Sequence, residues 1–417
     1  MNTTEAVAAQ NAAIQTALEG VSSLADSYKD ISTKNVGKHG LKDVGEVSEA
    51  RNALVMETWK LLGAVRGPVD ALFEHFENMS HTAACRSLLE MGVFDKLPLD
   101  GSSITGTELA DSLGVDKLLL VRLMRMATVK GPIAEVGPES YAHTPYSQVY
   151  IVPALRGLMK LMLDEYWPPM ARMSEFLKEN DWKNPESETN NPYTFAHQTG
   201  GRSMWAHMGQ YPDRIQAFNS AMQAQTQAAM PTVAIFPFEA ELSKFETQDC
   251  TPLVVDVGGG LGHTTLRIKE LCGNIKGRVI LQDRSAVIDD ISEPLLGVEK
   301  MKYDFFTAQP VKGALIYYIR RCLHDWSDRD CVRILKVIAR AMEPGKSRLL
   351  IAEICLPEEK ADMEAVLYDM TMMTLNGRER TKSDWMKILD GAEFDLKTVT
   401  VHTTAGSNYG VVEAYLK

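Results

Sequence analysis

Two side chains suited to proton transfer follow predicted β-strands in the second half of the chain. His324 comes shortly after the strand predicted over Ala314–Arg320, and Glu353 lies at the end of the strand predicted over Arg348–Ile354. The carboxyl ends of parallel strands face the ligand crevice of an α/β sheet. A histidine beside a carboxylate there can take a proton from a hydroxyl at neutral pH. A structural histidine is the alternative, and the position of His324 favours catalysis.

A glycine-rich turn lies upstream, between a predicted strand and a predicted helix. Its sequence, Asp256–Gly262, is DVGGGLG. Glycines let a backbone turn sharply and approach a ligand where a Cβ would intrude. Asp283 ends the next predicted strand, where an acidic side chain accepts hydrogen bonds from ribose hydroxyls in nucleoside-binding folds. The order strand, turn, helix, strand and acid therefore predicts a nucleoside cofactor.

The turn does not fit the usual phosphate-binding patterns, GxGxxG and the P-loop. Asp256 precedes the glycines on the strand itself, and its negative charge would repel a pyrophosphate. The same charge suits a ligand with an ammonium or sulfonium group, and S-adenosylmethionine has both. We therefore predict S-adenosylmethionine as the cofactor. No metal-ligand cluster stands out in the sequence, so we expect no metal.

The elements that must position these residues alternate as strands and helices in a doubly wound, Rossmann-like α/β domain, predicted over 246–417. The predicted strands are Leu253–Val257, Arg278–Gln282, Ala314–Arg320, Arg348–Ile354, Leu396–Thr403 and Gly410–Leu416, and the predicted helices are Leu266–Leu271, Arg329–Met342, Ala361–Leu375 and Ser383–Gly391.

The sequence pattern of the first part of the chain predicts a different, α-helical domain. Residues 1–50 form a variable lead with weak helical periodicity around 14–24, and residues 51–160 have the pattern of a winged helix. Its signals are helices at Arg51–Met79 and His81–Met91, a capping box in Thr105–Leu113, a helix at Lys117–Val129 and a hairpin at Pro132–Thr144. The third of these helices lacks a clear basic face, so a structural or dimer-forming role is favoured over DNA binding.

Residues 161–245 are helical and rich in methionine and aromatic side chains. Such a stripe is more often core than pocket, but its density here fits an adaptable wall around an apolar ligand.

The overall composition disfavours several classes of protein. The 417 residues include 44 Lys+Arg against 55 Asp+Glu, a formal net charge of -11, which disfavours general nucleic-acid binding. The apolar runs are far shorter than the roughly 20 residues of a membrane span, and no secretory signal is evident. The six cysteines lack CxxC spacing and are typical of reduced thiols. We expect a cytoplasmic protein without nucleic-acid or membrane partners.

Six motifs occur together in a fixed order. They are DVGGGLG, LQD, YDFF (Tyr303–Phe306), YYIRRCLHDWSD (Tyr317–Asp328), LLIAEICLPE (Leu349–Glu358) and MMTLNGRERT (Met372–Thr381). With them the chain resembles the class I S-adenosylmethionine-dependent O-methyltransferases of plant and fungal secondary metabolism, the caffeate type, and its motif wording is similar to fungal members. The resemblance extends from about residue 55 to the end and implies a winged-helix dimerisation domain and a homodimer.

The resemblance also implies roles for individual residues. The cofactor would be held by Asp256, Gly258, Gly260, Asp283, Asp304, Phe305, Arg320 and Trp326. His324 would be the general base, flanked by Glu353 and Glu379. An aromatic or polyketide-like acceptor would be lined by Trp167, Met170, Phe218, Asn219, Met222, Met370 and Met373.

Three functions remain open at this stage. The first is methyl transfer to a phenolic or enolic hydroxyl. The second is a dehydration or pericyclic ring closure, because some fungal proteins that resemble this family keep the cofactor without transferring its methyl group. The third is a winged-helix regulator that senses S-adenosylmethionine. The intact set of His324, Glu353 and Glu379 favours methyl transfer.

Overall fold

The computed structural model describes residues 3–38, 41–404 and 406–416, and the chain divides into two compact units. The first unit comprises residues 1–33, 50–167 and 208–225, and the second comprises residues 34–49, 168–207 and 226–417. None of the helices in the described part of the chain combines the length and apolar character that a membrane span needs.

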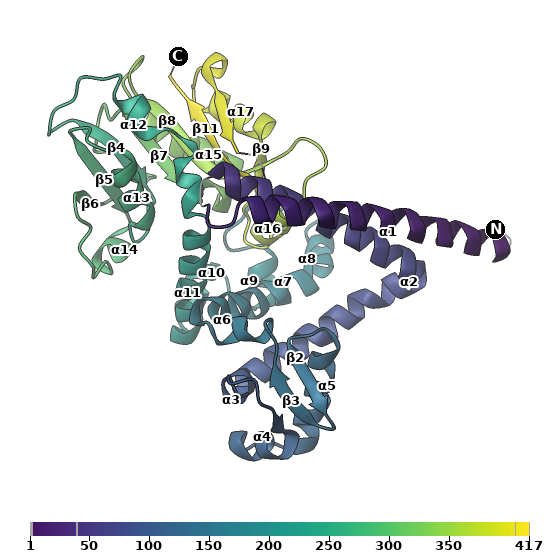
Figure 1. The fold of residues 1–417 in the computed structure, drawn as a ribbon. Coiled ribbons are helices and arrows are strands. Elements are labelled where there is room, and N and C mark those ends of the chain that lie inside the picture. Colours follow the sequence, from purple (N-terminus) through teal and green to yellow (C-terminus); the bar gives the residue numbers. More distant parts are fainter. Residues whose placement is uncertain (1–2, 39–40, 405, 417) are drawn as a thin grey trace. The chain divides into compact units, whose positions relative to one another are not determined.

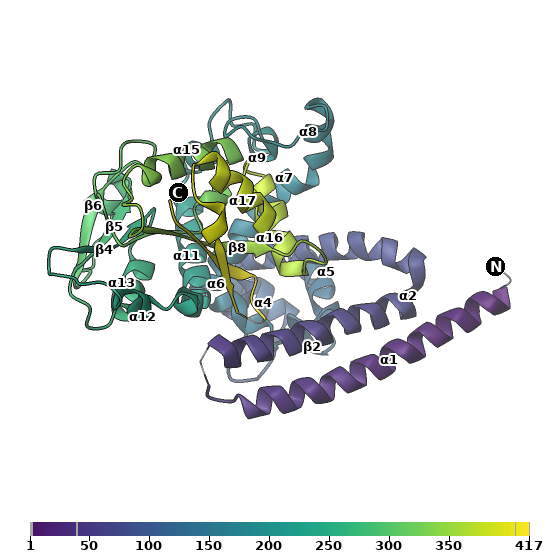
Figure 2. The same cartoon turned by 90° about the horizontal axis from the view of Figure 1, so that it is seen from above.

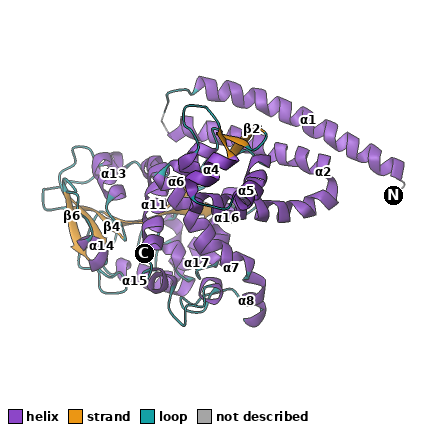
Figure 3. Cartoon of the chain, turned by 90° about the horizontal axis from the view of Figure 1, so that it is seen from below, coloured by secondary structure: helices purple, strands orange, loops and turns teal. Residues whose placement is uncertain are grey.

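Helices make up most of the first unit, whose strands form only a small three-stranded sheet in the order β1-β3-β2 (Figure 3). In chain order the elements of this part are α1 (Thr3–Lys34), α2 (Leu41–Met91), α3 (Val93–Lys96), β1 (Ile104–Thr105), α4 (Gly106–Leu113), α5 (Lys117–Val129), β2 (Ile133–Gly137), β3 (Ser140–His143), the 3-10 helix η1 (Ser147–Ile151), α6 (Pro153–Lys160), the π-helix η2 (Leu161–Tyr166), α7 (Trp167–Ala171) and, further along, α11 (Pro212–Ala228). Helices α2, α7 and α11 continue into the second unit.

The winged-helix pattern is confirmed. Thr105 accepts a hydrogen bond from the backbone of Glu108 while Glu108 reaches back to Thr105, the predicted capping box. Leu88, Leu109, Met124 and Tyr141 bring α2, α4, α5 and β3 into one core.

The N-terminal region is more helical than predicted. Instead of a helix limited to the periodicity around 14–24, α1 is a continuous helix of 32 residues. Its alanines have high helix propensity, and its apolar residues from Ile14 to Ile31 recur at three- and four-residue steps. Helix α2 also runs through the predicted break near Met79 and is interrupted instead at Gly67, whose φ is 73°. Helix α1 lies alongside α2 (Figure 2), and the Gln10 amide donates to the Ala64 carbonyl at 2.9 Å. That carbonyl lacks its usual helical partner because Pro68 has no N–H.

The second unit is built on a sheet of eight strands (Figure 1), with the path β10-β11-β8-β7-β4-β5-β6 and β9 paired to β8. Strands β6, β5, β4, β7 and β8 are mutually parallel, whereas β11 and β10 are antiparallel to their neighbours. The strands are β4 (Pro252–Val257), β5 (Arg278–Asp283), β6 (Val298–Lys302), β7 (Ile316–Arg320), β8 (Arg348–Leu356), β9 (Arg380–Thr381), β10 (Thr400–Thr403) and β11 (Tyr409–Ala414).

The helices of this part were largely expected. They are α8 (Met173–Glu179), α9 (Pro192–Ala196), α10 (Met204–Met208), α12 (Phe238–Leu242), α13 (His263–Leu271), α14 (Ser285–Asp289), α15 (Asp328–Ala339), α16 (Met363–Met373) and α17 (Lys382–Gly391), with 3-10 turns η3 (Met230–Ile235), η4 (Leu323–Asp325) and η5 (Leu396–Thr398). Strand β6 was not predicted, and the strand expected from Leu396 begins only at Thr400.

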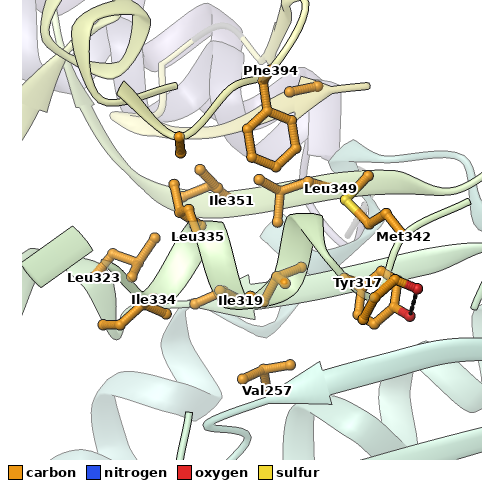
Figure 4. Packing of buried hydrophobic residues seen from close by; sticks show 14 of the residues in the cluster. Val257, Tyr317, Ile319, Leu323, Ile334, Leu335, Met342, Leu349, Ile351 and Phe394 are labelled. Carbon is orange, nitrogen blue, oxygen red and sulfur yellow. Dashed lines mark hydrogen bonds between the residues drawn. The ribbon is translucent and has the colours of Figure 1, made fainter. Parts of the chain in front are cut away.

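Alternate residues of each central strand enter two separate cores. Ile319, Ile351 and Val257 face α15 and α17 (Figure 4), whereas the intervening Tyr318 and Leu350 face α12, α13 and η3. Both faces are therefore buried, as in other parallel sheets.

The strand order reverses between β4 and β7, because β5 and β6 extend to one side of β4 and β7 and β8 to the other. Ligands of open α/β sheets bind at such a reversal, beyond the carboxyl ends of the strands.

Candidate active site

The glycine-rich turn follows β4 at this reversal. The backbone N–H of Gly258 donates to the Gln282 carbonyl at 2.8 Å, which fastens the turn to β5. Gly258 and Gly260 have φ values of 74° and 60°, in the left-handed region that favours glycine. A Cβ on Gly258 would lie 3.2 Å from the Cys322 sulfur, whereas a Cβ on Gly260 would meet nothing within 4 Å. Gly260 thus leaves open space of the kind that a cofactor needs.

The two acidic residues of the turn region have different partners. Asp256 is buried and accepts a hydrogen bond from the Thr265 hydroxyl at 2.6 Å, so it fastens β4 to α13. Burial raises the pKa of Asp256 to about 6, against the opposing effect of Thr265. Asp283 is only partly buried, and its Oδ2 accepts the Gly260 N–H at 2.8 Å. Asp283 is therefore the acid that lies beside the open side of the turn.

An aromatic cluster lies next to the turn. The ring centroid of Trp326 is 5.7 Å from that of Phe305 and 4.9 Å from that of Phe306, with nearly perpendicular planes. Phe305 also lies 3.9 Å from the position of a Cβ on Gly258. Asp304 is exposed at the start of this loop. The sequence assigned Phe305 and Trp326 to the cofactor but not Phe306, although it is the next residue of the same YDFF motif.

Arg320, at the end of β7, is hydrogen-bonded to other parts of the second unit. Its guanidinium donates to the Thr264 hydroxyl at 3.1 Å, to the Ala229 carbonyl at 2.8 Å and to the Thr232 hydroxyl at 3.0 Å. Arg320 thus joins η3 to α13, and its predicted place at the adenine edge stays a prediction.

His324 lies on η4, the short turn after β7, and is 5% exposed. Its Nδ1 is 2.7 Å from Glu379 Oε1 and 3.9 Å from Glu353 Oε2. Glu353 Oε1 accepts the backbone N–H groups of Cys322 and Leu323, each at 2.9 Å. The structure therefore brings together the three residues that the resemblance assigned to catalysis, from three different segments.

The charges around His324 set its protonation. Burial alone would lower its pKa, but Glu379, Glu353 and Asp325 more than offset this and raise the pKa to about 9. The pKa of Glu353 is raised, first by burial. Because Nδ1 faces Glu379, a proton on that nitrogen is held there. Nε2 of the ring lies 3.7 Å from Asp325 Oδ1.

The same three residues are also spaced as metal ligands can be, with one donor atom of each within 4.8 Å of the others. The sequence predicts these residues as a catalytic set but not as a metal site. However, a tetrahedral metal with bonds of about 2.0–2.2 Å would hold its ligand atoms roughly 3.4 Å apart. The 2.7 Å between His324 Nδ1 and Glu379 Oε1 is instead a hydrogen-bond distance, so the arrangement fits an oriented base better.

Comparison with known proteins decides the family. Residues 181–395 match the O-methyltransferase domain family and residues 73–153 match the O-methyltransferase dimerisation domain. The chain is 43% identical over 411 residues to the O-methyltransferase desB of Aspergillus desertorum, with 97% of each chain covered. The chain belongs to the O-methyltransferase family.

The solved structures agree with this assignment. OxaC in complex with SAH and oxaline matches the methyltransferase with a TM-score of 0.85 at 34% identity, covering 98% of this chain and all of that one. A structure described as a pericyclic reaction enzyme matches with a TM-score of 0.78 at 25% identity, covering 96% of this chain and all of that one. The protein is thus an S-adenosylmethionine-dependent O-methyltransferase with a dimerisation domain and relatives in fungal secondary metabolism.

The residues predicted to line the acceptor pocket lie on three helices. Trp167 begins α7, and Phe218, Asn219 and Met222 lie on α11, all within the first unit. Met170 on α7 and Met370 and Met373 on α16 belong to the second unit, and the two α16 methionines lie one turn apart. Asn219 and Met370 are exposed and the other five are half-buried.

Proposed function

We propose that this methyltransferase acts on a phenolic or enolic hydroxyl of an aromatic or polyketide-like small molecule, with His324 as the general base. The observation that supports this proposal is the 2.7 Å contact between His324 Nδ1 and Glu379 Oε1. It fixes the ring and directs Nε2 to the acceptor proton, as the carboxylate partner of a catalytic histidine does in other enzymes.

The raised pKa of His324 suits this reaction. The His324 pKa of about 9 is close to the pKa of a phenol, which is about 10. Proton transfer between the two groups is therefore nearly balanced in free energy. Because this pKa lies above neutral pH, the fraction of molecules with a neutral imidazole should rise as the pH approaches it. Glu353 and Glu379 would stabilise the imidazolium that forms.

Bound S-adenosylmethionine supplies a methyl group on a positively charged sulfonium, ready for in-line displacement by an oxygen nucleophile. We propose that Gly258 and Gly260 accommodate its methionine part and that Asp283 binds the ribose hydroxyls. Asp256 would add negative charge beside the turn. Asp304, Phe305 and Trp326 would enclose the adenine, with Arg320 at its edge. The open side of Gly260 and the edge-to-face rings of Phe305 and Trp326 fit a ligand of this shape.

The acceptor would lie among flexible, apolar side chains, since methionine adapts to irregular ligands. We propose a pocket lined by Trp167, Met170, Phe218, Asn219, Met222, Met370 and Met373. We also propose that residues 51–160 serve dimerisation, residues 161–245 contribute to this pocket and residues 246–417 catalyse the transfer.

We propose that the working form is a cytoplasmic homodimer. Helix α2, which runs into the dimerisation domain, has a row of exposed large apolar side chains. The exposed fractions are 66% for Val69, 70% for Leu72, 59% for Phe73 and 69% for Phe76. Contiguous apolar surface of this kind is typical of an interface. A monomer in light scattering at micromolar concentration would contradict the dimer.

The decisive experiment incubates the full chain with methyl-labelled S-adenosylmethionine and a panel of phenols and polyketides, and follows label and S-adenosylhomocysteine by mass spectrometry. We expect labelled product from the wild type and about 10²–10⁴-fold less from His324→Ala, with S-adenosylhomocysteine affinity unchanged by calorimetry.

Unlabelled but altered acceptors with the cofactor intact would favour ring closure or dehydration instead. The intact trio of His324, Glu353 and Glu379 favours methyl transfer, because that reaction needs a base for the proton of the acceptor hydroxyl.

A further inference from the structure

Arg380 is the charged residue that immediately follows Glu379, and it is completely buried. Burying a guanidinium is costly unless its donors are paired. Asp328, its acidic partner, contacts Nε and Nη2 at 2.9 Å but has a side chain that is 49% exposed. The positive charge of Arg380 is therefore balanced only by a half-exposed carboxylate. Its other N–H groups bind partners that are not charged.

Those donors bind carbonyl groups on both sides of His324. Nη1 of Arg380 donates to the Leu323 carbonyl at 3.0 Å, and Nη2 donates to the Trp326 carbonyl at 2.7 Å. The guanidinium also lies over the Trp385 ring, 5.2 Å from its centroid, which fixes the plane of the fork. Only a planar, forked cation can reach two carbonyls in this way, so arginine and lysine are not equivalent here.

Residues next to Arg380 also contact the turn η4, which contains His324. The Arg378 N–H donates to the His324 carbonyl at 2.8 Å. A Cβ on Gly377 would come within 2.2 Å of that carbonyl oxygen, so a glycine is required for this approach. Glu379 lies between these contacts and meets His324 Nδ1, while its own N–H donates to Asp369 at 2.9 Å.

The turn needs this support because it is short. Helix η4 has three residues and no side-chain cap at its start, and a 3-10 turn of this length has few hydrogen bonds of its own. Its position depends on partners from elsewhere in the chain.

We propose that Arg380 is a positioning residue, which fixes the backbone on both sides of His324 so that the imidazole stays against Glu379. The inference rests on the proposed role of His324 as the base. Arg380 does not itself meet acceptor or cofactor in this scheme.

The test measures the titration of His324 in the full chain without cofactor or acceptor, so it does not depend on methyl transfer being the reaction. The nine histidines would be labelled with carbon-13 at Cε1, and the His324 signal would be assigned from its loss in His324→Gln. The charged groups that face His324 are Glu353, Glu379 and Asp325, and all three remain in the variants.

In Arg380→Lys we expect the His324 pKa to fall by about one unit or more, because a looser turn weakens the contact with Glu379. The matched control is Arg348→Lys, which alters another buried arginine, at the opposite end of β8. It should leave the His324 titration unchanged.

A folded Arg380→Lys protein in which His324 titrates as in the wild type would overturn the proposal. If that variant does not fold, two neutralising variants of helix α15 decide. Asp330→Asn removes an acid that pairs with Arg333 instead and controls for the lost negative charge, whereas Asp328→Asn removes the acid that pairs with Arg380 and with Arg378. In Asp328→Asn we expect the His324 pKa to fall by at least about 0.3 units more than in Asp330→Asn. Equal titrations in the two variants would refute the positioning role.

Discussion

The two ends of strand β8 each hold a buried cluster of charged side chains. The clusters differ in how many of their carboxylate oxygens have a hydrogen-bond partner. At the amino end, Arg348 contacts Glu241 and Glu413 at 2.9 and 3.0 Å. Both oxygens of Glu413 are occupied, since Tyr415 also reaches Oε1 and His402 reaches Oε2. At the carboxyl end, Glu353 Oε2 and Glu379 Oε2 are buried without a hydrogen-bond partner among the described residues.

A buried acceptor left unpaired costs about 1–3 kcal/mol. The amino end avoids that cost, as a purely structural cluster should. The carboxyl end retains it beside a histidine of raised pKa, the combination expected where a proton must be held and moved. The comparison therefore supports the proposal that the cluster at the carboxyl end is catalytic, whereas the one at the amino end stabilises the sheet.

The strongest test of this contrast is Glu379→Gln. The amide removes the charge that holds and orients His324, and we expect kcat to fall by about 10⁴-fold, as when the carboxylate partner of a catalytic histidine is replaced by an amide. The acidic limb of the pH–rate profile should also move to lower pH, because Glu379 is the largest contributor that raises the His324 pKa. An unchanged profile in a correctly folded variant would contradict the proposed pairing.

At the amino end, Arg348→Met should affect stability instead. Removing Arg348 takes away the guanidinium that balances the charges of Glu241 and Glu413, and we expect a loss of roughly 3–4 kcal/mol in the free energy of unfolding. Chemical denaturation would measure the loss. The activity per folded molecule should be unchanged, and a comparable fall in kcat would mean that the two ends are coupled.

Sequence predicts the parts of this molecule whose signals are local. The capping box at Thr105, the helix Lys117–Val129 and the strand, glycine turn and acid around Asp256 all follow from residues close together in the chain. Strand β6 escaped prediction because its sequence, VEKMK, is half polar and lacks an apolar run. The full length of α1 was not predicted, because large apolar residues are sparse before Ile14.

The candidate site is predictable only in part, for the same reason. His324 and Glu353 follow from their places after strands, but Glu379 came from the family resemblance. Arg380 was missed, because a charged residue in GRERT is typical of a solvated helix start. Its complete burial is decided by the carbonyls of Leu323 and Trp326, more than fifty residues away.

The pH dependence of stability should also distinguish the clusters. His324 has a folded pKa of about 9 against the ordinary histidine pKa of 6.5, so its contribution to stability is fully present below pH 6.5 and is lost as the pH rises through 9. Between these limits we expect the wild type to lose on the order of 3 kcal/mol more than His324→Gln. Unfolding curves at pH 6 and pH 9.5 measure the difference, and parallel losses would place the stabilising charge elsewhere.

The smallest expected effects come from two glycines, one at each end of the sheet. Gly260 and Gly345 have φ values of 60° and 72°, and a Cβ on either would meet nothing within 4 Å. Alanine should therefore destabilise both positions equally, by about 1 kcal/mol of backbone strain. Only Gly260→Ala should also weaken S-adenosylhomocysteine binding, roughly tenfold by calorimetry, because its methyl group would fill space that the ligand needs. Equal affinities in the two variants would show that the space beside Gly260 is not where the cofactor binds.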